Sequence, residues 1–329
     1  MKALADIDIV IKYLILAMSF FPLIYNISFS FFGILFFGGV AFLGVIQGNP
    51  TSSLYLITAP LLASFSLKKT FDLKILYFAF GIICMVFLYE AQRGALDTFK
   101  TTSRNYVSVI MLFNSMLISL IAYNQTKKIL VWPYVLALFF SLLALGRGGI
   151  VCSFLCLMGI ILIKIHQLSK RVRYLLLSIV LIFVVGSIPL ILDVYEKLDF
   201  FERIREKGLK DDARAYIWDA YGSAMNTERL FLGYNLKNDA IISKYGDNPH
   251  NSYLFLHAHM GVLVVIPVLL VFYTLFFHIR KKEFIYVIPL FAILLRGFTD
   301  VIFMSPYDFI VLIFVLHAFM NKQKVLGDN

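Results

Sequence analysis

The chain has 329 residues, of which 60% are hydrophobic and only 15% are charged, and its formal net charge is +10. A soluble domain averages about half apolar and a quarter charged residues, so this composition excludes a soluble globular protein and indicates a polytopic membrane protein. Its basic residues gather between apolar stretches, and we therefore expect no nucleic-acid partner.

The apolar stretches are the predicted membrane spans, because each crossing needs about 20 apolar residues. They are continuous rather than alternating, and backbone polar groups cannot stay unpaired in lipid, so helices are expected and not barrel strands. We predict an all-α polytopic membrane protein with about 11 (10–12) transmembrane helices in a single integral membrane domain, 1–329. The predicted spans are approximately 9–26, 28–47, 52–66, 74–89, 105–123, 129–145, 150–165, 174–192, 250–277, 284–299 and 306–320.

Basic clusters in alternate loops predict the orientation, because positively charged short loops stay in the cytoplasm. All of these clusters fall on one side of the predicted topology. The C-terminus is then cytoplasmic, while the long segment 193–249 and a short turn at Gly146–Gly149 lie outside. The clusters lie at 68–74, 127–128, 170–173, 280–282 and 322–324.

The outer segment 193–249 is rich in charge and contains one stretch with helical periodicity, KDDARAYIWDAYGSAM at 210–225. Asp211 and Asp212 are candidate caps of that helix. Its arginine either pairs with Asp211 or snorkels to the interface, or it binds a phosphate with help from the helix N-terminus. The residues that share one helix face by their spacing are Arg214, Trp218, Tyr221 and Met225.

Two more arginines lie near the predicted outer face. Arg147 stands in ALGRGG, where the glycines allow a ligand to approach the backbone closely. It is either an interfacial snorkelling side chain or a phosphate ligand. Arg296 in LLRGFTD is followed by Asp300, and the two form either a structural ion pair or part of a binding site.

The stretch GDNPHNSYLFLHAHMGVL at 246–263 passes from turn residues directly into an apolar run. We predict a helix that begins near Pro249 with Asn248 as its cap. His250 then stands at the outer end of that helix, where a neutral imidazole can act as a base, and Asn251 can hydrogen-bond the loop or an acceptor. The histidines lack the i, i+4 spacing of a helical zinc pair, so no metal site is predicted.

In three places, taken in chain order, the sequence resembles the superfamily of O-antigen polymerases and O-antigen ligases, the Wzy/WaaL-type integral membrane glycosyltransferases. The first is the arginine of LGRGG, and the second is RAYIWDAY followed by LFLGYN at 230–235. The third is His250-Asn251, nine residues, then Gly261. Three residues later Val264 stands where that family pattern usually has Gly, Thr or Tyr.

The resemblance implies a fold similar to GT-C glycosyltransferases, with a large, partly helical periplasmic loop. It implies that His250 is the general base and that Arg147 and Arg214 hold an undecaprenyl diphosphate. It implies no cofactor and no metal, and a site at the periplasmic face of a bacterial inner membrane. Further candidate substrate contacts are Asn251, Trp218, Tyr221 and Arg296.

The favoured function is a polymerase that transfers lipid-linked oligosaccharide repeats onto an acceptor sugar hydroxyl in O-antigen or capsule synthesis. The alternative is a ligase that transfers glycan to lipid A-core, or a related enzyme that glycosylates protein. A third interpretation is a non-enzymatic transporter of lipid-linked oligosaccharide, although such a protein is expected to bury ionisable residues at mid-membrane. Expected partners are undecaprenyl-diphosphate-linked oligosaccharide, membrane lipids and a chain-length regulator.

Overall fold

The computed structural model describes residues 73–91, 104–144, 146–174, 178 and 212–303. Every element within these ranges is an α-helix or a short 3-10 helix, so the predicted helical class is confirmed for this part of the chain. Three helical segments in it are long and apolar enough to cross a membrane: Asn105–Thr126, Arg147–His166 and Ser252–Arg280. Three shorter apolar helices cover Leu73–Tyr89, Trp132–Leu143 and Phe284–Gly297.

The remaining predicted spans cannot be compared with the structure. Those at 9–26, 28–47, 52–66 and 306–320, and nearly all of 174–192, lie outside the described residues. The chain divides into two compact units, one of residues 83–219 and one that combines 1–82 with 220–329. Helices α4 (Leu73–Ala91) and α10 (Asp212–Ser223) each continue from one unit into the other.

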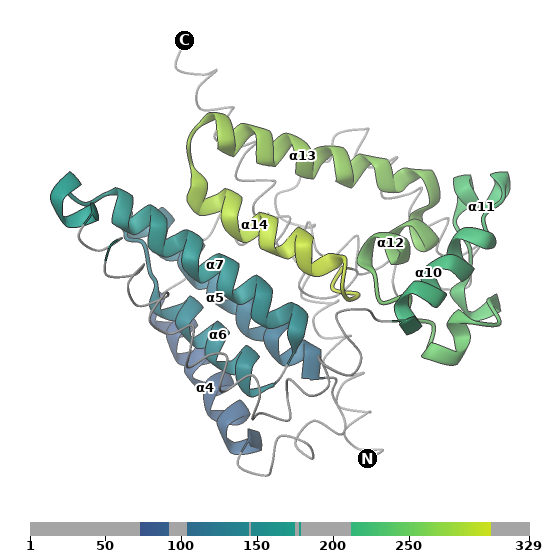
Figure 1. Ribbon diagram of the computed structural model, residues 1–329, viewed down its shortest axis with the longest axis horizontal. Helices are drawn as coiled ribbons and strands as arrows, with labels where there is room; N and C mark the ends of the chain where they lie inside the picture. The colour runs from purple at the N-terminus through teal and green to yellow at the C-terminus, as the bar shows by residue number, and fades with distance from the viewer. Residues whose placement is uncertain (1–72, 92–103, 145, 175–177, 179–211, 304–329) are drawn as a thin grey trace, which may run out of the picture. The chain divides into compact units, whose positions relative to one another are not determined.

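In the unit 83–219, α5 (Arg104–Thr126), α6 (Trp132–Leu143) and α7 (Arg147–His166) pack against one another (Figure 1). Small polar side chains lie where these helices meet, as is common between membrane helices. Ser115 Oγ donates to the Pro133 carbonyl at 2.7 Å, and the hydroxyls of Ser141 and Ser153 lie 3.0 Å apart. These bonds connect α5 to α6 and α6 to α7.

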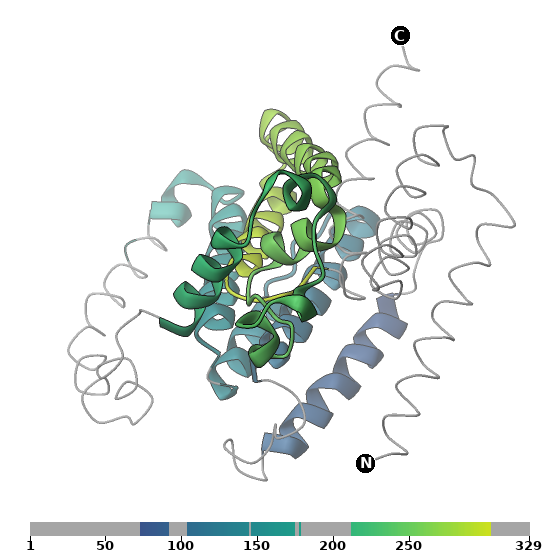
Figure 2. The same ribbon diagram turned by 90° about the vertical axis from the view of Figure 1, so that its right-hand side faces the viewer.

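In the other unit, α13 (Val265–Arg280) and α14 (Phe284–Gly297) form a hairpin. At its turn Glu283 N–H donates to the His278 carbonyl at 2.9 Å, and the Glu283 carboxylate lies 2.8 Å from His278 Nδ1. The shorter elements of this unit precede the hairpin in the chain. They face the viewer in Figure 2, which is turned by 90° from Figure 1. They are α11 (Thr227–Leu232), η1 (Leu236–Asn238), η2 (Ile242–Tyr245), α12 (Ser252–Met260) and η3 (Gly261–Val264).

The predicted span at 250–277 falls on the segment Ser252–Arg280, which is long and apolar enough to cross a membrane, but this segment is not one regular helix. The structure divides this stretch into α12, η3 and α13. The interruption occurs at Gly261, whose φ of 52° lies outside the helical range. A glycine adopts this conformation at little steric cost, and the chain changes direction there.

Candidate functional site

His250 lies in a tight loop, not in a helix. Gly246, Asp247 and His250 all have positive φ, at 70°, 59° and 49°. Asn248 Oδ1 accepts a 2.7 Å hydrogen bond from His250 N–H, which holds the loop in this shape. The predicted helix start near Pro249 with Asn248 as cap is therefore wrong, because Asn248 uses its side chain for this turn and α12 begins at Ser252.

Asn251 is the N-cap of α12. Its backbone is extended, and its Oδ1 accepts from the N–H groups of Tyr253 at 2.9 Å and Leu254 at 3.2 Å. These are helix-start donors that have no partner within the helix. The amide oxygen predicted to contact the loop or the acceptor thus stabilises the helix start, and this places His250 directly before the cap.

Gly261 is the C-cap of the same helix, and its N–H donates to the His257 carbonyl. A Cβ at this position would collide with the backbone of Phe231 and Leu232 in α11. Two independent constraints, a positive φ and a close backbone approach, therefore require glycine here. The nine residues between Asn251 and Gly261 are α12 itself, so the spacing of the sequence pattern is the length of a capped helix.

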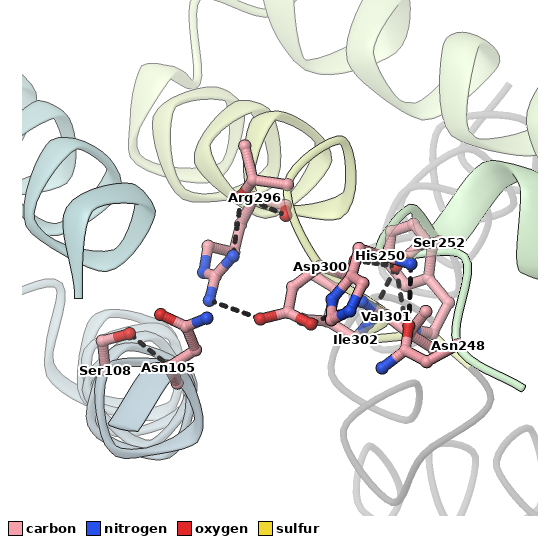
Figure 3. A network of polar contacts seen from close by, with 11 residues as sticks. Asn105, Ser108, Asn248, His250, Ser252, Arg296, Asp300, Val301 and Ile302 are labelled. Carbon is pink, nitrogen blue, oxygen red and sulfur yellow. Dashed lines mark hydrogen bonds and ion pairs between the residues drawn. The ribbon is translucent and has the colours of Figure 1, made fainter. Parts of the chain in front are cut away.

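Ser252 fixes the start of α12 to the segment that follows α14. Its Oγ donates to the Asp300 carbonyl at 2.8 Å and accepts from Ile302 N–H at 2.8 Å. Tyr253 adds a bond from its hydroxyl to the Leu294 carbonyl at 2.7 Å. Figure 3 shows the imidazole of His250 next to this serine-centred network. The first residues of α12 are thereby fixed from two directions.

Arg296 and Asp300 form an ion pair in the same unit (Figure 3). The guanidinium lies 3.2 Å from the carboxylate, and it also donates to Thr299 Oγ1 at 2.7 Å. Arg296 is 1% exposed and Asp300 is 4% exposed. Of the two interpretations of this arginine, the structural ion pair therefore agrees with the geometry. Removing either partner of a buried ion pair is strongly destabilising, because it leaves the other charge buried without compensation.

Tyr221 and His257 connect α10 with α12. The tyrosine hydroxyl lies 2.6 Å from His257 Nδ1, and His257 Nε2 lies 3.0 Å from the Leu230 carbonyl. A carbonyl can only accept, so Nε2 carries the ring proton and Nδ1 accepts from the hydroxyl. Burial raises the pKa of the Tyr221 hydroxyl well above its usual value, which keeps the donor protonated.

We call this hydrogen-bonded pair the Tyr221–His257 clamp. The sequence did not predict that these two residues bond to each other. Tyr221 was expected to contact substrate, but it is only 4% exposed and its hydroxyl is directed to His257. Burial and the Asp239 carboxylate also raise the pKa of the neighbouring Tyr234 to about 12. The rings of Tyr221 and Tyr234 lie 5.3 Å apart and support the clamp from the side of α11.

In the unit 83–219, Arg147 is the first residue of α7, and its side chain is exposed. The predicted turn at Gly146–Gly149 is therefore wrong, because Arg147 to Gly149 belong to the helix, whereas the predicted span at about 150–165 lies within α7. Gly146 is the N-cap and provides no side-chain hydrogen bond. A cation at the positive end of a helix dipole is unfavourable by about 0.3–1 kcal/mol, unless an anion binds beside it.

The glycines next to Arg147 do not all serve ligand approach. A Cβ on Gly149 would collide with the side chain of Ser108 in α5. Ser108 itself donates to the Asn105 carbonyl at 2.7 Å. Gly149 thus allows α5 and α7 to approach closely, which is a packing role and not the predicted one.

Arg214 lies in the first turn of α10 and is half-buried, and Trp218 follows one turn later and is 37% exposed. The predicted helix face of Arg214, Trp218, Tyr221 and Met225 is shorter than expected, because α10 ends at Ser223 and Met225 lies beyond it. The expected cap Asp211 falls outside the described residues. The two units divide the predicted site residues as follows: Arg147, Arg214 and Trp218 in 83–219, and Tyr221, His250, Asn251 and Arg296 in the other.

Sequence reasoning missed the Ser252 network and the Tyr221–His257 clamp. Both connect residues far apart in the chain, 48 positions for Ser252 and Asp300 and 36 for Tyr221 and His257. One signal was present, since an asparagine directly before an apolar helix is a capping signal. As for metals, no group of three or more His, Cys, Asp or Glu side chains that could hold an ion occurs within the described ranges.

Comparison with known proteins places the site in a family context. Residues 132–269 match a family model described as O-Antigen ligase. This range contains Arg147, Arg214, His250 and Gly261, so the resemblance to the O-antigen ligase and polymerase superfamily is confirmed. No curated protein and no solved structure matched the chain significantly.

Proposed function

We propose that this protein, which carries the O-antigen ligase-type domain over residues 132–269, is a membrane glycosyltransferase that polymerises lipid-linked oligosaccharide repeats. The family match supports a function of the ligase or polymerase type. The apolar helices support a location in the membrane. In the proposal the enzyme resides in a bacterial inner membrane, its site faces the periplasm, and its C-terminus is cytoplasmic.

The observation that carries the proposal is the backbone of His250. A positive φ is uncommon outside glycine, and such strain persists only where surrounding contacts over-determine it. Here the Asn248 bond and the Asn251 cap are those contacts. A histidine whose backbone is held in this way, just outside a helix start and in the region of the family match, is our proposed proton acceptor.

In the proposed reaction, His250 accepts the proton of the acceptor sugar hydroxyl. The hydroxyl oxygen bonds to the anomeric carbon of the donor, and the bond from that carbon to the diphosphate oxygen breaks. The leaving group is the polyprenyl diphosphate, which departs with both electrons of that bond. General-base assistance of this kind contributes about 10²–10⁴-fold in rate.

The proposed ligands of the diphosphate are Arg147 and Arg214, as the resemblance implies. Each guanidinium offers a planar fork of donors that matches phosphate oxygens. The position of Arg147 at the first residue of α7 supports its role, because bound phosphate and the free N–H groups of a helix start attract each other. This mechanism assigns no step to a metal or a cofactor.

The remaining predicted contacts have different proposed roles. The exposed ring of Trp218 is available to a sugar or to the lipid of the donor. Tyr221 and Arg296 act as positioning residues, since their polar atoms bond to His257, Thr299 and Asp300. Asn251 positions His250 by capping α12. A chain-length regulator is a proposed partner that acts on the product.

A ligase is the second candidate, and the description of the matched family favours it. The two functions differ in the acceptor. A polymerase extends one lipid-linked glycan with another, whereas a ligase transfers the glycan to lipid A-core.

The deciding experiment supplies purified, reconstituted protein with lipid-linked repeat units, either alone or together with lipid A-core. The polymerase proposal expects a ladder of longer lipid-linked glycans from the donor alone. If glycan appears only on lipid A-core, the protein is a ligase and the polymerase proposal is wrong. If neither product forms in a preparation that binds donor, the enzyme proposal itself is refuted.

A further inference from the structure

The short helix α11 presents three consecutive large apolar side chains to the outside. Leu230, Phe231 and Leu232 are exposed. The helix itself is well formed, with Asn226 as its N-cap and Gly233 as its C-cap. Runs of exposed apolar residues in a well-formed helix indicate a surface that is covered by something apolar.

The backbone of α11 is fixed while its side chains point away. The Leu230 carbonyl accepts from His257, the backbone at Phe231 and Leu232 lies against Gly261, and Tyr234 N–H donates to the Ala258 carbonyl at 2.9 Å. These bonds leave the α11 backbone little freedom to turn its apolar side chains inward.

The exposed side chains of α11 have apolar neighbours at the start of the next span. α11 packs against η3, and η3 leads directly into α13. We call these residues the outer apolar patch, and their exposed fractions lie between 40% and 53%. The patch consists of Leu230, Phe231, Leu232, Val262, Val265 and Ile266.

The patch continues into a row along α13. Leu269, Phe272 and Phe276 are 61%, 63% and 62% exposed and follow Val262 and Val265 at helical spacing. They lie in the segment Ser252–Arg280, which is long and apolar enough to span a membrane. An exposed apolar stripe on such a segment faces lipid, so the patch is continuous with a lipid-facing surface.

The length of α13 indicates that the lipid extends to the patch. Its 16 residues rise about 24 Å at 1.5 Å per residue. The hydrocarbon layer is about 30 Å thick. Arg280, Lys281 and Lys282 mark the polar boundary at one end, so the hydrocarbon must reach beyond Val265 at the other, to the level of η3.

We infer that the outer apolar patch is buried in the acyl chains of the outer leaflet, and that α11 is an interfacial helix that anchors the loop 212–249 to the membrane surface. The inference is independent of the proposed chemistry and takes from the proposed function only the orientation, in which the loop 212–249 faces the periplasm. As a consequence, the Tyr221–His257 clamp, which bonds the Leu230 carbonyl of α11, lies at a fixed depth in the membrane–water interface.

Tryptophan fluorescence in lipid vesicles tests this inference. In a Trp132→Phe, Trp218→Phe background, a single tryptophan is placed by Phe231→Trp, by Leu269→Trp or by Lys237→Trp. Leu269 lies on the lipid-facing row and Lys237 is an exposed cation in η1, so they provide the lipid and water references. Vesicles of phosphatidylcholine brominated near the headgroup end of the chains quench from the lipid, and iodide quenches from the water.

The Phe231→Trp protein should follow the Leu269→Trp reference, with strong loss of emission in brominated lipid and severalfold weaker quenching by iodide than Lys237→Trp. Quenching that follows Lys237→Trp would overturn the inference. Shielding from both quenchers would also overturn it, because a protein surface would then cover the patch. No donor or acceptor is needed, so the result is separate from that of the glycosyltransferase assay.

Discussion

Asn251 and Gly261 close the two ends of one helix, and each does so with a different part of its structure. Asn251 uses its side-chain oxygen to accept from two N–H groups at the start of α12. Gly261 uses its lack of a side chain, with a φ of 52° and the backbone of α11 directly against it. Together they place His250 at the N-terminal end of α12 and α11 at its C-terminal end.

We expect Gly261→Ala to destabilise the protein. A residue with a Cβ in this strained conformation costs of order 1–3 kcal/mol, and displacement of the α11 backbone adds to it. Thermal unfolding of the purified protein measures the effect. Gly222→Ala is the matched control, because no atom lies within 4 Å of a Cβ there and the glycine is in α10. That change should stabilise by about 0.5–1 kcal/mol. Equal unfolding temperatures for the two variants would show that Gly261 is not required by its surroundings.

His250→Ala should leave a folded protein that binds the lipid-linked donor but transfers it about 10²–10⁴-fold more slowly, because the proposed base is removed. Product formation is counted on gels, and donor binding is measured separately. The control is His259→Gln, since His259 is 5% exposed and its Nδ1 bonds the Phe255 carbonyl within α12. The control should keep most of its activity. Near-normal transfer by His250→Ala would leave His250 as a loop residue only.

Arg147→Ala and Arg214→Ala should each weaken donor binding, by about 1.5–3 kcal/mol for each lost charge-assisted contact. Lysine at either position should restore only part of the binding, because a point charge lacks the bidentate fork. Binding of labelled polyprenyl diphosphate provides the measurement. Arg171→Ala, which removes an exposed guanidinium from a predicted cytoplasmic cluster, should bind as the parent does. An arginine whose alanine variant binds normally has no place in the site.

Tyr221→Phe should lower the free energy of unfolding by about 1–3 kcal/mol at neutral pH, because His257 Nδ1 loses its donor in a partly buried place. Thermal unfolding measures this. Tyr216→Phe removes a hydroxyl from a residue that is 55% exposed, and it should change little.

The same pair of variants tests the raised pKa of Tyr221. An unfolded tyrosine loses its proton near pH 10, whereas the folded Tyr221 keeps it at higher pH. Above pH 10 the unfolded state therefore binds fewer protons, and the stability of the parent falls as the pH rises. Tyr221→Phe lacks this contribution, so its disadvantage should shrink between pH 9 and pH 11. A constant difference over that range would contradict the assignment.

Labelling with a membrane-impermeant thiol reagent from outside the cell should modify Lys244→Cys and spare Arg171→Cys. Both residues are exposed in the structure, so a difference in labelling reports the side of the membrane. The three native cysteines, of which Cys152 and Cys156 are buried, are replaced in the parent of both variants. Modification of Arg171→Cys alone would invert the predicted orientation.

Composition and hydropathy were enough to predict a helical membrane protein, and the described predicted spans fall on helices from α4 to α14. This part was readable because transfer of apolar residues into lipid is a sum of local contributions along the chain. The motif positions were also found in the sequence, since each was marked by a short local pattern: Arg147 by LGRGG, and His250 with Gly261 by a spacing of nine residues after Asn251. Even there, the start of α12 was misplaced, because two asparagines compete for the cap and only one can take it.

Only the tertiary structure decided how those residues are held. Ser252 hydrogen-bonds to the backbone of a residue 48 positions away, and Tyr221 hydrogen-bonds to His257, 36 positions away. Gly149 leaves space for the side chain of Ser108, which belongs to a different helix. A hydrogen bond or a close contact of this kind depends on which segments fold against each other, and residue types along the chain contain no local record of it. The sequence by itself determined the helical class of the described segments and supplied the prediction of which residues carry the chemistry. The packing of the segments determined that Asn251 caps α12, that Arg296 is buried in an ion pair, and that Tyr221 supports a histidine instead of facing outward.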